Sequence, residues 1–205
     1  MTTEQTLPIF PLSVVLFPEG GLPLRIFEPR YLRMVKDCVR SGDGFVVTLI
    51  RSGREAGAAA EFHQVGTVAQ ITQWDQGSDG MLQVLVRGTH RVQVLDYTVA
   101  PDQLITGRVL ALEREVPTGI AEQHAPLAGL LEKIFHEHGM DLPGAEKMQD
   151  ATWVGCRLAE LLPMPMTRRQ WLLELTNPSL RLDALAQIAT DLFDGTPDSG
   201  SRKTH

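Results

Sequence analysis

The chain has 205 residues, 43% of them hydrophobic and 21% charged, with a formal net charge of −6. This composition is typical of a globular protein and disfavours a disordered chain. The acidic balance disfavours a nucleic-acid-binding protein, because such proteins contact phosphate through clustered Lys and Arg.

Cys38 and Cys156 are the only cysteines in the chain. Two cysteines do not make a disulfide framework, so we predict two buried thiols in a reducing compartment. No basic segment followed by an apolar leader opens the sequence, and no apolar run reaches membrane-spanning length. The sequence therefore predicts a cytoplasmic location and no membrane partner.

Residues 7–31 (LPIFPLSVVLFPEGGLPLRIFEPRY) form the densest apolar and proline-rich block of the chain. Proline lacks a backbone donor and fixes φ, which confines it to strand starts, strand edges and turns. The block therefore predicts short extended segments and no long helix. These segments are Ile9–Phe10, Val14–Phe17 and Pro23–Phe27.

A helix is predicted to begin at Pro29, because proline suits the first helical position and Glu28 suits the positive end of the helix. Apolar residues follow at helical spacing, at positions 31, 32, 35, 38 and 39. Arg30, Arg33, Lys36 and Arg40 share the remaining face. We predict that this face is solvated.

Short strand patterns follow at close intervals, and they predict a small barrel or a curled antiparallel sheet. The segment 51–61 predicts a mobile loop, because it has no apolar side chain larger than alanine. Gly88, Thr89 and His90 predict a hairpin link between two strands. The expected strands are 44–50, 62–72, 81–87, 91–97 and 104–112, the last one interrupted at Gly107.

Strand patterns stop near Pro117, and the rest of the chain predicts a bundle of about four helices. Thr167 is expected to cap the third helix, because Thr-Arg-Arg-Gln has the form of a capping box. Asn177 followed by Pro178 predicts the start of the last helix. Trp153 and Trp171 are expected in the helical core, whereas residues 1–6 and 195–205 are expected to be loose.

The order and spacing of several short pieces resemble the N-terminal substrate-binding domain of Lon proteases, which is PUA-like. The pieces are Leu7 to Leu12, Phe17-Pro18, Pro23-Leu24 and Ile26 to Tyr31. The resemblance implies an α+β fold, with an N-terminal PUA-like β pseudobarrel that has one inserted helix, followed by a C-terminal α-helical bundle. The expected domains are 7–116 and 118–194.

The chemistry of the parent proteases has no counterpart in this sequence. The phosphate-binding pattern G-x-x-x-x-G-K-[ST] is missing, and no serine lies in the peptidase motif of the family. His136 and His138 lack the H-E-x-x-H spacing of a helical zinc site. We therefore expect no enzyme activity, no catalytic residue, no metal and no cofactor.

The resemblance implies a stand-alone, non-enzymatic binding module that recognises unfolded polypeptide or a protein partner, without the ATPase and peptidase domains. The site is expected on apolar surface of the barrel or between barrel and bundle. The alternative is a small-molecule or RNA site in the PUA-like barrel, for which the helix from Arg30 to Arg40 is the cationic candidate.

Five residues are candidates for binding: Arg25, Glu28, Arg30, Tyr31 and Trp74. The three charged ones lie in an apolar block, where charges are usually paired. We favour an ion pair and a helix cap for them over direct contact with a peptide. Trp74 stands beside a Gly-rich turn and is expected to be exposed.

Overall fold

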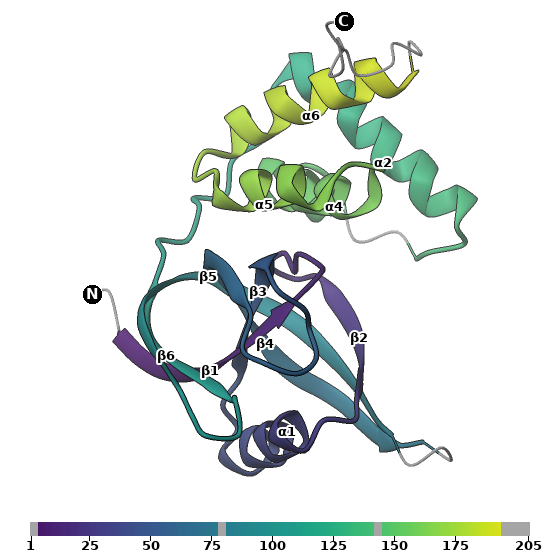
Figure 1. Cartoon of the computed structure of the whole chain (residues 1–205). Coiled ribbons are helices and arrows are strands. Elements are labelled where there is room, and N and C mark those ends of the chain that lie inside the picture. The colour runs from purple at the N-terminus through teal and green to yellow at the C-terminus, as the bar shows by residue number, and fades with distance from the viewer. Residues whose placement is uncertain (1–3, 78–80, 142–144, 194–205) are drawn as a thin grey trace, which may run out of the picture. The chain divides into compact units, whose positions relative to one another are not determined.

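The structure is a computed structural model that describes residues 4–77, 81–141 and 145–193. It is an α+β fold, as the sequence predicts (Figure 1). The chain divides into two compact units. The first unit contains Met1–Arg114 and Met164–Glu174, and the second contains Glu115–Pro163 and Leu175–His205.

The first unit is built on one mixed six-stranded sheet, in the order β2-β5-β4-β3-β1-β6. β1 and β3 are parallel and the other neighbours are antiparallel. β5 also pairs with β6, so the sheet curls into a partly closed barrel, while β2 pairs with β5 alone. The strands are β1 (Glu4–Leu12), β2 (Gly21–Ile26), β3 (Phe45–Ser52), β4 (Glu61–Gln76), β5 (Leu82–Val99) and β6 (Ile105–Ala111).

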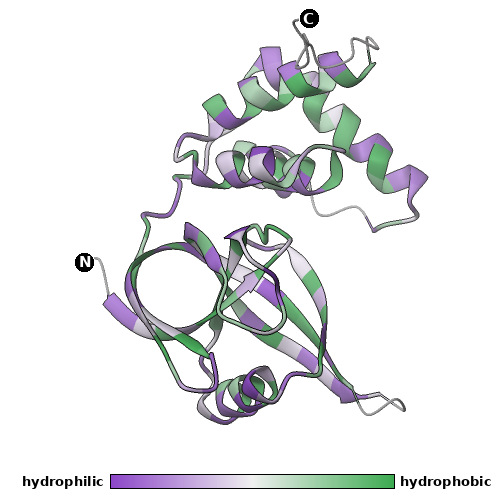
Figure 2. Ribbon diagram, in the orientation of Figure 1, coloured by the Kyte–Doolittle hydropathy of each residue, from purple (hydrophilic) through white to green (hydrophobic). Residues whose placement is uncertain are grey.

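β1 is buried on both faces, so it contributes to two apolar clusters. Leu7 and Ile9 pack inside the barrel with residues such as Val46. Phe10 and Leu12 point the other way, into a cluster with helix α1 (Pro29–Ser41). Figure 2 shows apolar and polar residues alternating along several strands, as expected when side chains point to opposite faces of a sheet.

The predicted hairpin at residues 88–90 is wrong, because β5 continues through these residues as one long strand. A Cβ on Gly88 would lie 2.2 Å from the carbonyl oxygen of Phe17. Residue 88 is therefore glycine because the carbonyl of Phe17 approaches the strand there, and it does not form a turn. Val14–Phe17 is not a strand, and Gly107 does not interrupt β6.

We expect Gly88→Ala to lower the free energy of unfolding by about 2–3 kcal/mol, because the added methyl group meets a backbone oxygen that cannot move aside cheaply. Gly21→Ala is the matched control, since a Cβ there meets nothing within 4 Å. Urea unfolding followed by circular dichroism measures both variants. Equal stability of the two would contradict the packing argument.

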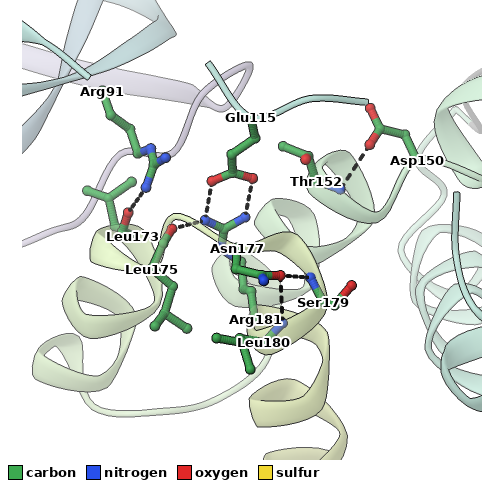
Figure 3. A network of polar contacts seen from close by, with 10 residues as sticks. All are labelled: Arg91, Glu115, Asp150, Thr152, Leu173, Leu175, Asn177, Ser179, Leu180 and Arg181. Carbon is green, nitrogen blue, oxygen red and sulfur yellow. Dashed lines mark hydrogen bonds and ion pairs between the residues drawn. The ribbon is translucent and has the colours of Figure 1, made fainter. Parts of the chain in front are cut away.

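The second unit is helical, and its last helix, α6 (Pro178–Phe193), begins where Asn177 and Pro178 predict. Asn177 caps α6, because its Oδ1 accepts the backbone N–H groups of Ser179 and Leu180 at 2.9 and 3.3 Å (Figure 3). Asp150 caps α4 by accepting the N–H of Thr152 at 2.9 Å. The unit contains η1 (Glu122–His124), α2 (Ala125–Glu137), α3 (Ala145–Met148), α4 (Ala151–Leu161) and α6 (Pro178–Phe193).

Helix α5 (Met166–Glu174) belongs to the first unit, whereas the sequence predicted it as part of the bundle. Gln170 donates to the carbonyl of Val65 in β4 at 3.0 Å. Figure 3 shows the second contact, in which Arg91 of β5 donates to the carbonyl of Leu173 at 2.8 Å. These contacts join α5 to the sheet. The boundaries 7–116 and 118–194 remain a prediction about which parts of the chain fold independently.

Three further expectations need correction. Thr167 lies inside α5, which begins at Met166, and the carbonyl of Pro165 accepts the N–H groups of Arg168 and Arg169. Trp171 is 44% exposed, so it does not lie in the helical core. Trp153 is buried, as the sequence predicted. Residues 4–6 are part of β1, while 1–3 and 195–205 lie outside the described residues.

Candidate functional site

Two hollows include residues of β2, and together they contain four of the five predicted site residues. The first, here called the β2 hollow, has a volume of about 450 Å³ and includes Arg25, Glu28 and Tyr31. The second, here called the outer groove, has a volume of about 1000 Å³ and includes Arg25 and Trp74. The two share Pro23, Leu24 and Arg25.

The β2 hollow is lined mainly by apolar side chains from β1, β2 and the start of α1. Five of them are buried, namely Phe10, Leu12, Leu24, Ile26 and Tyr31, whereas Phe27 is 63% exposed. The lining residues are Phe10, Leu12, Val14, Leu22, Pro23, Leu24, Arg25, Ile26, Phe27, Glu28, Tyr31, Glu55 and Ala56. Phe27 was missed by the sequence reasoning, although it is the large apolar residue that precedes the helix start.

Arg30 lies behind the β2 hollow, where it braces the structure. Its side chain is 4% exposed and pairs with Glu28 at 3.0 Å. It donates to the carbonyls of Gln103 at 2.9 Å and Glu55 at 3.3 Å. The guanidinium also lies 4.5 Å from the ring centroid of Tyr31. The predicted solvated position is therefore wrong for Arg30. The predicted ion pair is present, between Arg30 and Glu28, but the Glu28 side chain makes no capping hydrogen bond to α1.

The loop between β3 and β4 is held by hydrogen bonds at several points, in contrast to the predicted mobile segment. The Glu55 carboxylate accepts the N–H of Ser13 at 2.6 Å, and the Glu28 carboxylate accepts that of Gly57 at 3.4 Å. Ala59 donates its N–H to the Gln103 side chain at 3.2 Å. The loop thereby fixes one wall of the β2 hollow.

Tyr31 forms another wall of the β2 hollow and is buried, with 5% of its surface exposed. Its ring stacks on Phe10 with centroids 3.9 Å apart. Burial raises the pKa of Tyr31 above its usual value, against the opposing effect of Arg30. The phenol therefore stays neutral at physiological pH and has no role as a base.

The outer groove lies over the sheet formed by β2, β5 and β4. Arg25 and Asp75 both face Gln83 in the strand register, so a cation and a carboxylate flank the same residue. Trp74 is 60% exposed, as the sequence predicted. The groove offers an exposed indole and polar side chains, a combination suited to contact with another chain.

Neither hollow contains a nucleophile placed against a base. Within the described parts of the chain, no group of three or more His, Cys, Asp or Glu is placed to hold a metal ion. Cys38 and Cys156 are both buried, and burial raises the pKa of each thiol to about 11. Both thiols are therefore protonated and unreactive at neutral pH.

The structure gives little support to the two alternative sites. The barrel interior is filled by packed side chains such as Ile9, Val46 and Val92. On α1, Arg30 is buried and Arg33 pairs with Asp102, which weakens the cationic face considered for RNA. No helix in the described ranges is long and apolar enough to cross a membrane.

Comparison with known proteins gives a consistent result. Residues 6–191 match the family model described as the ATP-dependent protease La (LON) substrate-binding domain. The chain is 30% identical to Lon protease 2 of Herpetosiphon aurantiacus over 94% of its own length and 24% of the relative's. It is 29% identical to a Lon protease of Xanthomonas oryzae over 92% of its length and 23% of the relative's. It thus spans about a quarter of these curated relatives.

Solved structures agree with the family match. A Lon N-terminal domain protein from Xanthomonas campestris has a TM-score of 0.76 and 37% identity, with 89% of this chain and 98% of that one covered. The N-terminal domain of a Mycobacterium avium complex Lon protease has a TM-score of 0.64 at 14% identity, covering 91% and 99% of the two chains. At that identity the second match supports the fold alone.

Proposed function

This chain belongs to the family of Lon substrate-binding domains, and we propose that it is a binding module for unfolded polypeptide, or for a protein partner that presents an unfolded segment. The family match over residues 6–191 carries this proposal. The free, buried cysteines support a cytoplasmic location.

We also propose that this chain does no chemistry on what it binds. Its relatives align with it over about a quarter of their length, 24% and 23% in the two cases above. Hydrolysis of ATP or of peptide bonds would need groups outside the matched region. An assay for ATP hydrolysis and casein cleavage with the purified chain is expected to give no turnover above background.

Two features of the first unit suit polypeptide binding. Phe27 and Trp74 are large side chains that are more than half exposed, one in each hollow. The walls around Phe27 are held in place by Arg30 and the loop that it contacts. A rigid apolar hollow beside exposed aromatic side chains is a recurrent design for peptide recognition.

The direct test is a titration of the protein into fluorescein-labelled β-casein, an unfolded chain, with fluorescence anisotropy as the readout. We expect saturable binding in the micromolar range. No change in anisotropy at high micromolar protein would contradict the proposed function.

We expect Phe27→Ser to weaken casein binding about tenfold, because exposed aromatic side chains at the centre of a site supply much of the binding free energy. Phe193→Ser is the matched control, since Phe193 is 69% exposed but lies in α6 of the second unit. Equal losses in both variants would show that the β2 hollow has no special role.

A further inference from the structure

β2 is the one strand of the sheet order that stands at an end with a single neighbour in the described residues. We propose that its free edge takes an extended, apolar segment of unfolded polypeptide as an added strand. This inference rests on the proposed function and says how the segment is held. Strand edges with unpaired backbone groups are ready templates for another chain.

The direction of the backbone groups follows from one hydrogen bond. Gly88 of β5 donates its N–H to the carbonyl of Gly20 at 2.9 Å. The carbonyl and the N–H of a trans peptide unit point in opposite directions. The N–H of Gly21 therefore points away from β5, toward the free edge.

Pro23 fits the same alternation. Residues of an antiparallel strand point both backbone groups alternately toward and away from their neighbour. Pro23 is two residues beyond Gly21, so its missing N–H falls on the free edge, where proline is tolerated in a strand. The edge thus offers the N–H of Gly21 and the carbonyls of Gly21 and Pro23 to an incoming chain.

The two hollows are placed to take the side chains of such a segment. Side chains of an added strand would alternate between the two faces of the sheet. Leu24 and Ile26 of β2 are buried and line the β2 hollow. Pro23 and Arg25 are exposed on the other face of the strand, opposite Leu85 and Gln83 of the outer groove. A single extended chain would therefore use both hollows together.

Charge narrows the chemistry of the segment. The β2 hollow is lined by the carboxylates of Glu28 and Glu55 and by the guanidinium of Arg25, and Glu28 pairs with Arg30 at 3.0 Å. The lining is therefore close to charge balance, but the chain as a whole has a net charge of −6, which disfavours an acidic segment. We infer that the bound segment is apolar and either neutral or basic. A peptide with glutamate at both ends should therefore bind more weakly than the same peptide with lysine at both ends.

The test compares Gly21→Pro with Gly21→Ala. Proline removes the edge N–H and is tolerated at the first residue of a strand, whereas alanine keeps the N–H and enters open space. The probe is a fluorescein-labelled peptide of alternating valine, threonine and phenylalanine with lysine at both ends. We expect proline to weaken binding about three- to tenfold and alanine to change it less than twofold.

The outcomes separate this inference from the proposed function. If wild-type protein binds neither casein nor the peptide, both fail. If the wild type binds and the two Gly21 variants bind equally well, edge pairing alone is overturned. The same peptide, N-methylated at alternate residues, provides a test on wild-type protein in case Gly21→Pro does not fold. One of its two methylation registers should abolish binding, and unchanged binding in both would overturn the proposal.

Discussion

Arg181→Met is expected to lower the free energy of unfolding of the second unit by about 3–5 kcal/mol. Arg181 is 1% exposed and makes a two-point ion pair with Glu115, at 2.8 and 2.6 Å (Figure 3). It also donates to the carbonyl of Leu175 at 2.5 Å. The variant leaves the Glu115 carboxylate, of which 5% is exposed, buried beside an apolar side chain.

Urea unfolding followed by circular dichroism measures this loss. Lys133→Met is the matched control, because the Lys133–Glu137 pair lies in the same unit but is exposed, and it should cost at most about 1 kcal/mol. Adding Glu115→Gln to Arg181→Met should restore part of the stability, since the buried charge is then gone. Equal costs for the two single variants would show that the buried pair contributes nothing special.

Arg30→Met is expected to have the second largest effect, a loss of about 2–4 kcal/mol in the first unit. The variant leaves Glu28 without its 3.0 Å ion pair and the carbonyl of Gln103 without its 2.9 Å donor. It also releases the carbonyl of Glu55, so the loop between β3 and β4 loses an anchor. We expect faster amide hydrogen exchange in residues 53–60 as well as lower stability.

Arg33→Met is the control on the same helix. Arg33 pairs with Asp102, but its side chain is 54% exposed, so its loss should change stability by less than about 1 kcal/mol. If Arg30→Met left both stability and exchange unchanged but reduced peptide binding, Arg30 would be a contact residue. That result would overturn the bracing role assigned to it.

The parts of the fold that depend on local chemistry could be predicted from the sequence. Pro29 starts α1 and Asn177 caps α6, because these residues act on neighbours within one helical turn. Pro23 was rightly expected in an extended segment. Each of these expectations needed only the residue and its immediate surroundings.

The errors come from contacts between residues far apart in the chain. Gly88 looks like a turn residue, and only the approaching carbonyl of Phe17 explains why it lies inside a strand. Arg30 occupies a helical position that looks solvated, but its partners at Gln103 and Glu55 come from distant loops. No local sequence pattern predicts such partners.

The candidate site was predictable in part for the same reason. Arg25, Glu28 and Tyr31 were singled out from one continuous block, and the β2 hollow contains all three. Phe27 went unnoticed because an apolar residue in an apolar block predicts burial, whereas this one is 63% exposed. The hollow itself depends on the loop around Glu55, whose position the sequence does not reveal.

We expect this chain to distinguish unfolded polypeptide from folded protein. Isothermal titration calorimetry with one protein in two states tests it most directly, using native α-lactalbumin and its reduced, carboxymethylated form. We expect micromolar binding to the unfolded form and affinity for the native form at least about tenfold weaker, because only an extended segment can reach the edge of β2. Equal affinity for both forms, or no heat with either, would contradict the account.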